Sequence, residues 1–185
     1  MTGGEETRLD PGVFGAVADR VGRQLGDGPL EAADGRGLRI GIACALFNGG
    51  VTARLLVGAL GGLGEASVDR ADVTVAWVPG AFELPLAAQC LATDGRTDAV
   101  VCLGAVIRGD TAHFDFVAGE CAAGLQRVAL DTGLPVIFGV LTTDTVAQAQ
   151  ERALPDTTNK GYEAAVTALE MVRLLELLPP STPRS

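Results

Sequence analysis

Hydrophobic residues are arranged along this chain in two alternating patterns. Nearly continuous aliphatic runs, typical of strands buried on both faces of a sheet, occur at residues 38–46, 72–78, 99–107 and 136–141. Apolar residues that recur every three or four positions indicate helices with one buried face, at about residues 51–63, 83–93, 114–132, 145–153 and 159–178. This alternation predicts an α/β fold: a three-layer sandwich in which helices cover both faces of a four-stranded parallel sheet.

The chain divides into one domain and two flanking segments. Its 185 residues suffice for one well-cored domain, which is predicted at residues 38–178. Residues 1–37 are predicted to form an extension: a disordered start, an amphipathic helix at about residues 11–25, and a Gly- and Asp-rich linker. The helix could dock on the domain or on a neighbour. The tail 179–185 is polar and proline-rich, hence predicted to be loose.

Composition and charge exclude several classes of protein. The hydrophobic fraction of 48% argues against disorder, and a net charge of −9 argues against nucleic acid or an anionic membrane as the main partner. No apolar run approaches the roughly 20 residues of a spanning helix, and the acidic N-terminus does not resemble a secretory signal. A cytoplasmic protein is therefore expected.

Cysteine and histidine usage argues against a metal site. The four cysteines have no C-x-x-C spacing and lie in apolar segments, so we expect buried small hydrophobic residues rather than ligands or disulfides. A single histidine rules out a His-rich metal site. The phosphate-binding loop, the dinucleotide-binding glycine pattern and the G-x-S-x-G elbow are all missing from the sequence.

Polar and aromatic residues collect in the four turns that follow the predicted strands, at residues 47–50, 79–83, 108–113 and 142–145. Right-handed crossovers bring such turns to one edge of a parallel sheet, so we expect them to surround one crevice. The third turn holds His113, the only histidine, and histidine is the residue type most often used for proton transfer. Thr111 and the free amides of the helix start could bind a phosphate. Alternatively, Asp110 or Thr111 caps the helix and His113 rides on its first turn.

Other candidates have equally plain alternatives. Phe47 could stack on a flat heterocycle while Asn48 reads its polar rim; taken alone, a core phenylalanine and a turn-forming asparagine are favoured. Glu83 could bind hydroxyl groups or simply favour a helix start. Lys160 is the only lysine among 14 basic residues, which suggests a specific need, although a solvated surface lysine is the alternative.

Six segments carry a resemblance to a known family. They are FNGGVTARLLVGAL, WVPGAFELPLAA, DAVVCLGAVIRGDTAHFDFV, PVIFGVLTTDT, QAQERA and NKGYEAAVTALEM, and they resemble, in order, the successive blocks of the lumazine synthases over about residues 38–178. The resemblance implies a flavodoxin-like fold and a transferase of riboflavin biosynthesis. That enzyme condenses 5-amino-6-(D-ribitylamino)uracil with 3,4-dihydroxy-2-butanone 4-phosphate to 6,7-dimethyl-8-ribityllumazine, releasing phosphate and water, with no cofactor.

The resemblance also implies a role for each matching residue. His113 would shuttle protons, and Phe47 would stack on the pyrimidine ring. Phe138 would come from a neighbouring subunit. The residues implied to hold the ring and its ribityl chain are Asn48, Ala81, Phe82, Glu83, Val106, Ile107 and Lys160. The residues implied to cradle the phosphate are Gly109, Asp110, Thr111 and Arg152.

The chain departs from the family pattern in three places; the first bears on the stiffness of the third turn and the other two bear on assembly. Ala112 stands where a proline is common, residues 154–158 (LPDTT) replace a Gly/Lys-rich loop, and the N-terminal extension is longer than usual. We therefore expect a homopentamer or a dimer of pentamers rather than an icosahedral capsid. Two alternative functions share the scaffold: a non-catalytic flavin- or lumazine-binding or shell protein, and an archaeal-type riboflavin synthase.

Overall fold

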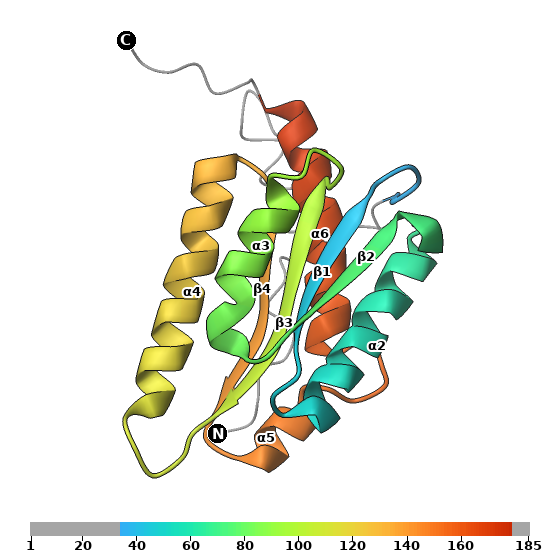
Figure 1. The fold of residues 1–185 in the computed structure, drawn as a ribbon. Helices are drawn as coiled ribbons and strands as arrows, with labels where there is room; N and C mark the ends of the chain where they lie inside the picture. Colours follow the sequence, from blue (N-terminus) through green and yellow to red (C-terminus); the bar gives the residue numbers. More distant parts are fainter. Residues whose placement is uncertain (1–33, 179–185) are drawn as a thin grey trace, which may run out of the picture.

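Four parallel strands form the middle layer of the fold (Figure 1). They are β1 (Ile40–Ala45), β2 (Val73–Val78), β3 (Ala99–Ile107) and β4 (Val136–Thr143), in the order β2-β1-β3-β4. The computed structural model describes residues 34–178. The predictions for residues 1–33 and for the tail 179–185 therefore lie outside the described residues.

Helices cover both faces of this sheet, which confirms the predicted three-layer α/β fold. α2 (Gly49–Glu65) and α6 (Lys160–Leu177) pack on one face, and α3 (Leu84–Ala92) and α4 (His113–Thr132) pack on the other (Figure 1). The short helix α5 (Val146–Glu151) and the 3₁₀ turns η1 (Arg70–Asp72) and η2 (Ala81–Glu83) complete the connections. No helix within residues 34–178 is long and apolar enough to cross a membrane.

The continuous apolar run of β3 reflects its place between two hydrophobic cores. Val101 and Leu103 face the core under α2 and α6, whereas Val100 and Cys102 face the core under α3 and α4. Because successive side chains of a strand point to opposite faces, a strand covered on both sides needs apolar residues at every position. β4 runs two residues further than predicted, since Thr142 and Thr143 still pair with β3.

Glycines and one buried asparagine bring α2 and α6 together. A Cβ atom on Gly58 would collide with the Asn159 side chain, and one on Gly161 would overlap the Leu55 carbonyl. Asn159 caps α6 by accepting from the Gly161 amide at 2.8 Å. Its Nδ2 donates to the carbonyl oxygens of Arg54, at 3.2 Å, and Leu154, at 2.8 Å. This contact explains why a glycine-rich segment is helical despite the usual cost of glycine in a helix.

The cysteine prediction is right at three positions and wrong at the fourth. Cys44, Cys102 and Cys121 are buried, and burial raises the pKa of the Cys44 and Cys121 thiols to about 11. Cys90 is exposed, because Leu84 and Ala88 form the buried side of α3 and Cys90 lies off that side. A short apolar segment did not reveal which of its residues faces the sheet.

Candidate active site

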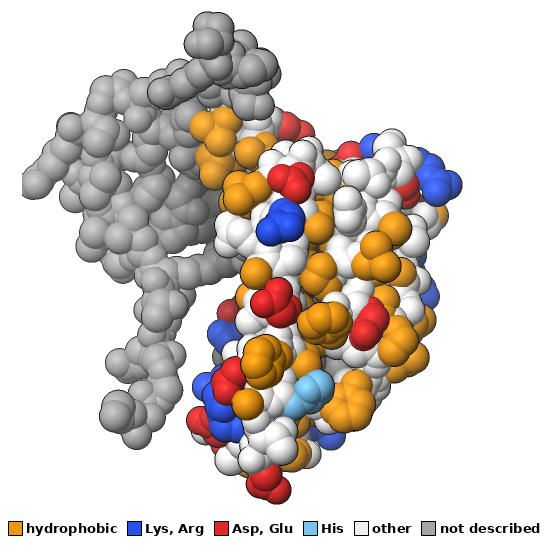
Figure 2. All heavy atoms as spheres, turned by 60° about the vertical axis from the view of Figure 1, so that its left-hand side comes forward, with side chains coloured by type: hydrophobic (Ala, Val, Ile, Leu, Met, Phe, Trp, Pro, Cys, Tyr) orange, Lys and Arg blue, Asp and Glu red, His pale blue; other side chains and the backbone are white. Residues whose placement is uncertain are grey.

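The turns that follow β1, β2 and β3 surround a pocket of about 670 Å³ at the carboxyl edge of the sheet. Figure 2 shows the single histidine, in pale blue, among hydrophobic side chains on this face. The residues predicted from the sequence that line this pocket are Phe47, Asn48, Ala81, Phe82, Glu83, Val106, Ile107, Gly109, Thr111 and His113. Pro79 and Gly80, which belong to the predicted second turn, also line it, and Ala105, Phe114, Phe116 and Val117, for which the sequence indicated no role in the site, complete its lining.

The first turn presents an aromatic ring to the pocket. Asn48 adopts a left-handed conformation, with φ of 58°, and its Nδ2 donates to the Ala105 carbonyl oxygen at 2.8 Å. The Phe47 amide donates to the Pro79 carbonyl oxygen at 3.1 Å, which joins the first turn to the second. Phe47 is 71% exposed. Phe47 is therefore not a core residue, whereas the turn-forming role of Asn48 is confirmed.

The second turn places a carboxylate beside the pocket. Glu83 ends η2 and occupies the N-cap position of α3, yet its side chain makes no capping hydrogen bond. A Cβ atom on Gly80 would lie 3.2 Å from Glu83 Oε2, so the carboxylate folds back over this glycine. Ala81 is buried and Phe82 is largely exposed. The turn thus offers a backbone edge, an aromatic ring and an acceptor for hydroxyl groups.

The third turn holds His113 as the first residue of α4. The capping alternative is only partly right: Ala112 occupies the N-cap position, Asp110 does not cap, and Thr111 Oγ1 accepts from the His113 amide at a long 3.4 Å. Asp110 is exposed and does not line the pocket. The N-terminal end of α4 therefore lies next to an imidazole, a combination suited to an anion and a proton transfer.

Arg108 is a feature of this turn that the sequence reasoning missed. Its Nε lies 3.1 Å from Asp144 Oδ1, its Nη2 lies 3.1 Å from Asp115 Oδ1, and its guanidinium stacks 4.0 Å above the Phe114 ring centre. Hydrogen bonds to Asp115 and Asp144 raise the pKa of Arg108. The residue connects the third turn to the fourth. Its two acidic partners are 7 and 36 residues away, and no local pattern pairs them.

Phe138, Arg152 and Lys160 lie elsewhere, in a groove of about 390 Å³ between β4 and α6. Lys160 Nζ lies 2.7 Å from both carboxylate oxygens of Glu163, and Arg152 Nη1 donates to the Gln148 carbonyl oxygen at 3.0 Å. The expectation of one crevice therefore holds for three turns only. The fourth leads into this separate groove, which runs along the outer edge of β4 and is closed by α6.

The comparison with known families identifies the chain. Residues 37–176 match the family model described as 6,7-dimethyl-8-ribityllumazine synthase. The chain belongs to this family. The match begins before β1 and ends one residue before the end of α6, so it includes all three turns of the His113 pocket and the whole groove of Phe138.

Membership in the 6,7-dimethyl-8-ribityllumazine synthase family makes the protein a transferase of riboflavin biosynthesis that acts on small molecules and assembles into oligomers. The hollows fit substrates of that kind: one combines aromatic rings, a carboxylate and an imidazole, and the other holds two cations. Within residues 34–178, no group of three or more His, Cys, Asp or Glu side chains could hold a metal ion.

Proposed function

We propose that this protein condenses 5-amino-6-(D-ribitylamino)uracil with 3,4-dihydroxy-2-butanone 4-phosphate to form 6,7-dimethyl-8-ribityllumazine. The observation that carries this proposal is the pocket in which Phe47, Glu83 and His113 lie together at one sheet edge. A flat ring, a polyol chain and a proton transfer each find a matching group there.

The ring and its ribityl chain would occupy the part of the pocket near Phe47. Its exposed aromatic face suits stacking on the pyrimidine. Asn48 and the backbone groups of Ala81, Val106 and Ile107 would bind the polar rim of the ring. Phe82 and Glu83 belong to the adjacent turn, where the Glu83 carboxylate would accept hydrogen bonds from ribityl hydroxyls.

The phosphate would bind at the third turn, near Gly109, Asp110 and Thr111. Amides at the start of α4 favour an anion there, although the Asp110 carboxylate must point away from it. No Lys or Arg lines the described part of this pocket. A dianion therefore requires a cation from another source.

We propose that a neighbouring copy of the chain supplies this cation. Its groove would face the His113 pocket and add Arg152 at the phosphate, Lys160 at the ribityl chain and Phe138 at the ring. Exposed Phe47, Phe82 and Phe116 around the pocket provide an apolar surface for such a contact. The complete site would then lie between subunits, so that a monomer would be inactive.

The reaction would proceed without a covalent bond to the enzyme. The 5-amino group attacks the ketone carbon of the butanone, and water leaves to give an imine. Loss of a proton beside the imine and departure of phosphate produce an enol, which becomes a ketone. The ribitylamino nitrogen attacks this ketone, and a second water leaves. Positioning of two reactive substrates would supply much of the acceleration, with His113 moving the protons.

A direct assay tests the reaction. Purified protein is incubated with both substrates, and the absorbance and fluorescence of the lumazine product are followed. We expect product to form only when both substrates are present. Binding of lumazine or flavin without turnover would favour the non-catalytic alternative, and conversion of lumazine to riboflavin would favour the archaeal-type synthase.

Co-production of two impaired variants, assayed at a butanone phosphate concentration well below the KM expected for Arg152→Ala, tests the shared site. Chains with His113→Ala and chains with Arg152→Ala carry different tags, and mixed oligomers are purified through both. A contact between the intact His113 pocket of one chain and the intact groove of the other restores a complete site, so we expect part of the activity to return. Activity no higher than that of either variant alone would mean that each chain builds its own site.

A further inference from the structure

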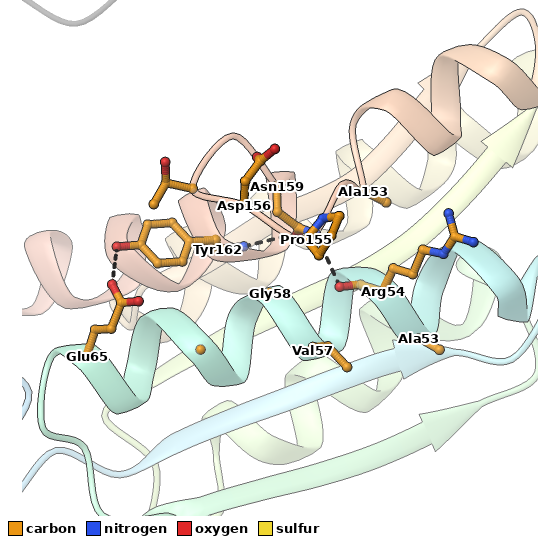
Figure 3. Close-up of a pocket in the computed structure, with 12 residues that line it drawn as sticks. Ala53, Arg54, Val57, Gly58, Glu65, Ala153, Pro155, Asp156, Asn159 and Tyr162 are labelled. Atoms are coloured by element: carbon orange, nitrogen blue, oxygen red, sulfur yellow. Dashed lines mark hydrogen bonds between the residues drawn. The ribbon is translucent and has the colours of Figure 1, made fainter.

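A third hollow, of about 720 Å³, lies between α2 and the loop that joins α5 to α6 (Figure 3). α2 lines this groove with three small residues, Ala53, Gly58 and Gly61, and with the apolar side chain of Val57. The loop adds the apolar ring of Pro155. Val57 is 68% exposed. None of the residues that line this groove lines either of the other two hollows. The groove is therefore separate from the candidate active site.

Two charged groups of opposite sign lie toward the two ends of the groove. Figure 3 shows Tyr162 reaching from α6 to Glu65 at the C-terminal end of α2, where its hydroxyl donates to Glu65 Oε2 at 2.7 Å. Arg54 lies near the opposite end of α2, and Asp156 belongs to the loop. An occupant with an apolar face and charges of both signs would match these groups.

The described chain begins beside one end of this groove. The Gly35 amide donates to the Ala66 carbonyl oxygen at 2.7 Å, and Arg173 Nη2 donates to the Asp34 carbonyl oxygen at 2.6 Å. Ala66 directly follows Glu65, which lines the groove. Residues 1–33 are therefore attached close to the Glu65 end of the hollow.

The predicted amphipathic helix of residues 11–25 has the right length and reach. Fifteen helical residues span roughly 22 Å, and α2 rises roughly 18 Å from Ala53 to Glu65 at 1.5 Å per residue. The linker of residues 26–33 can bridge at most about 26–29 Å when fully extended, and its attachment point, Asp34, lies beside the Glu65 end of the groove. A helix laid parallel to α2 would bring Arg23 toward Glu65 and Asp10 toward Arg54.

We propose that residues 11–25 occupy this groove of their own chain, with Phe14, Val17, Val21 and Leu25 against Val57 and Pro155. In this proposal the extension binds the domain of its own chain and not that of a neighbouring copy. It also gives the apolar face of the predicted helix a partner that chain connectivity keeps nearby.

Crosslinking of the full-length protein tests the proposal. The exposed Cys90 is replaced by serine, which leaves only the buried thiols of Cys44, Cys102 and Cys121. Val17→Cys and Val57→Cys are then introduced together, and the protein is treated with a short bismaleimide. We expect a link within one chain, seen as a monomer on a denaturing gel and as joined peptides by mass spectrometry.

Two matched pairs serve as controls. Asp19→Cys with Val57→Cys tests the polar side of the predicted helix, and Val17→Cys with Leu130→Cys tests α4, on the opposite face of the sheet. We expect at least tenfold less intrachain linking in both. A link between two chains, equal linking in all three pairs, or no link in the test pair would each overturn the proposal.

A second measurement does not depend on the engineered cysteines. Hydrogen exchange is compared between the unmodified protein and a full-length Val17→Asp, Val21→Asp variant. We expect faster exchange at residues 11–25 and along 153–159 in the variant, because the groove loses its occupant. Unchanged exchange along 153–159 in a correctly folded variant would also overturn the proposal.

Discussion

His113 and Arg152 lie in separate hollows of one chain and would share a single reaction only across a subunit contact. Each contributes a different chemical capability. An imidazole can act as a general acid or base, whereas a guanidinium keeps its charge and presents a planar fork to a phosphate. Substitution of the two residues should therefore alter different kinetic parameters.

Replacement of His113 by alanine should lower kcat by roughly 10²-fold, since general acid–base groups contribute about 10²–10⁴-fold and these substrates are intrinsically reactive. Steady-state rates of lumazine formation measure the effect. Circular dichroism and the elution volume of the oligomer show whether the variant is folded and assembled. A folded variant with unchanged kcat would mean that His113 has no role in catalysis.

Replacement of Arg152 by alanine should raise the KM for the butanone phosphate much more than the KM for the ribitylaminouracil. A hydrogen bond to a charged group is worth about 1.5–3 kcal/mol, which corresponds to roughly 10- to 150-fold. Titration of each substrate at a saturating concentration of the other separates the two constants. Arg152→Lys, which keeps the charge without the fork, should lie between. Equal effects on both constants would assign Arg152 a structural role.

At the scale of elements, α2 and α6 pack closely because the glycines at their contact have no side chain. Gly161 lies against the Leu55 backbone, and Gly58 lies against Asn159, which in turn holds the loop before α6. This loop separates Arg152 from Lys160, and the Lys160 amide donates to the Arg152 carbonyl oxygen at 2.9 Å. The close helix contact therefore fixes the spacing of the two cations.

Gly161→Ala should destabilise the protein by about 1–3 kcal/mol or more, as overpacking of a tight contact does. Gly64→Ala is the matched control: nothing lies within 4 Å of its Cβ position, so alanine should stabilise α2 by about 0.5–1 kcal/mol. Urea unfolding of both variants and the unmodified protein, at one protein concentration, gives the comparison. Equal stability of all three would contradict the close contact.

At the scale of the whole molecule, the loop of residues 154–158 bears on assembly. Asp156 Oδ1 accepts from the Thr158 amide at 2.8 Å, and hydrogen bonds to Thr158 lower the pKa of Asp156. The Asn159 amide donates to the Asp156 carbonyl oxygen at 3.1 Å, and Pro155 restricts the backbone further. This loop differs in stiffness and charge from the Gly/Lys-rich turn expected of a capsid former.

We therefore predict a free pentamer or a dimer of pentamers. Light scattering coupled to gel filtration should give about 95 or 190 kDa, five or ten times the chain mass of 18.9 kDa. The double variant Asp156→Lys, Pro155→Gly restores a flexible, positively charged turn and should be measured alongside the unmodified protein. A megadalton particle formed by the unmodified protein in mild buffer would contradict the prediction.

Local patterns in the sequence determined the elements and much of the His113 pocket. β3 was predicted with its observed bounds, because a strand buried on both faces needs a continuous apolar run. The turns after β1, β2 and β3 meet as predicted, because right-handed crossovers put them on one edge. The match to the family confirms the resemblance carried by the same segments.

Only the tertiary structure decided where the remaining groups lie. The strand order β2-β1-β3-β4 places β4 at an edge, so that Phe138, Arg152 and Lys160 line a groove of their own. The exposure of Cys90 was likewise missed. Periodicity reports which residues share a face of an element, whereas strand order and packing between distant elements decide which face is covered and which groups meet.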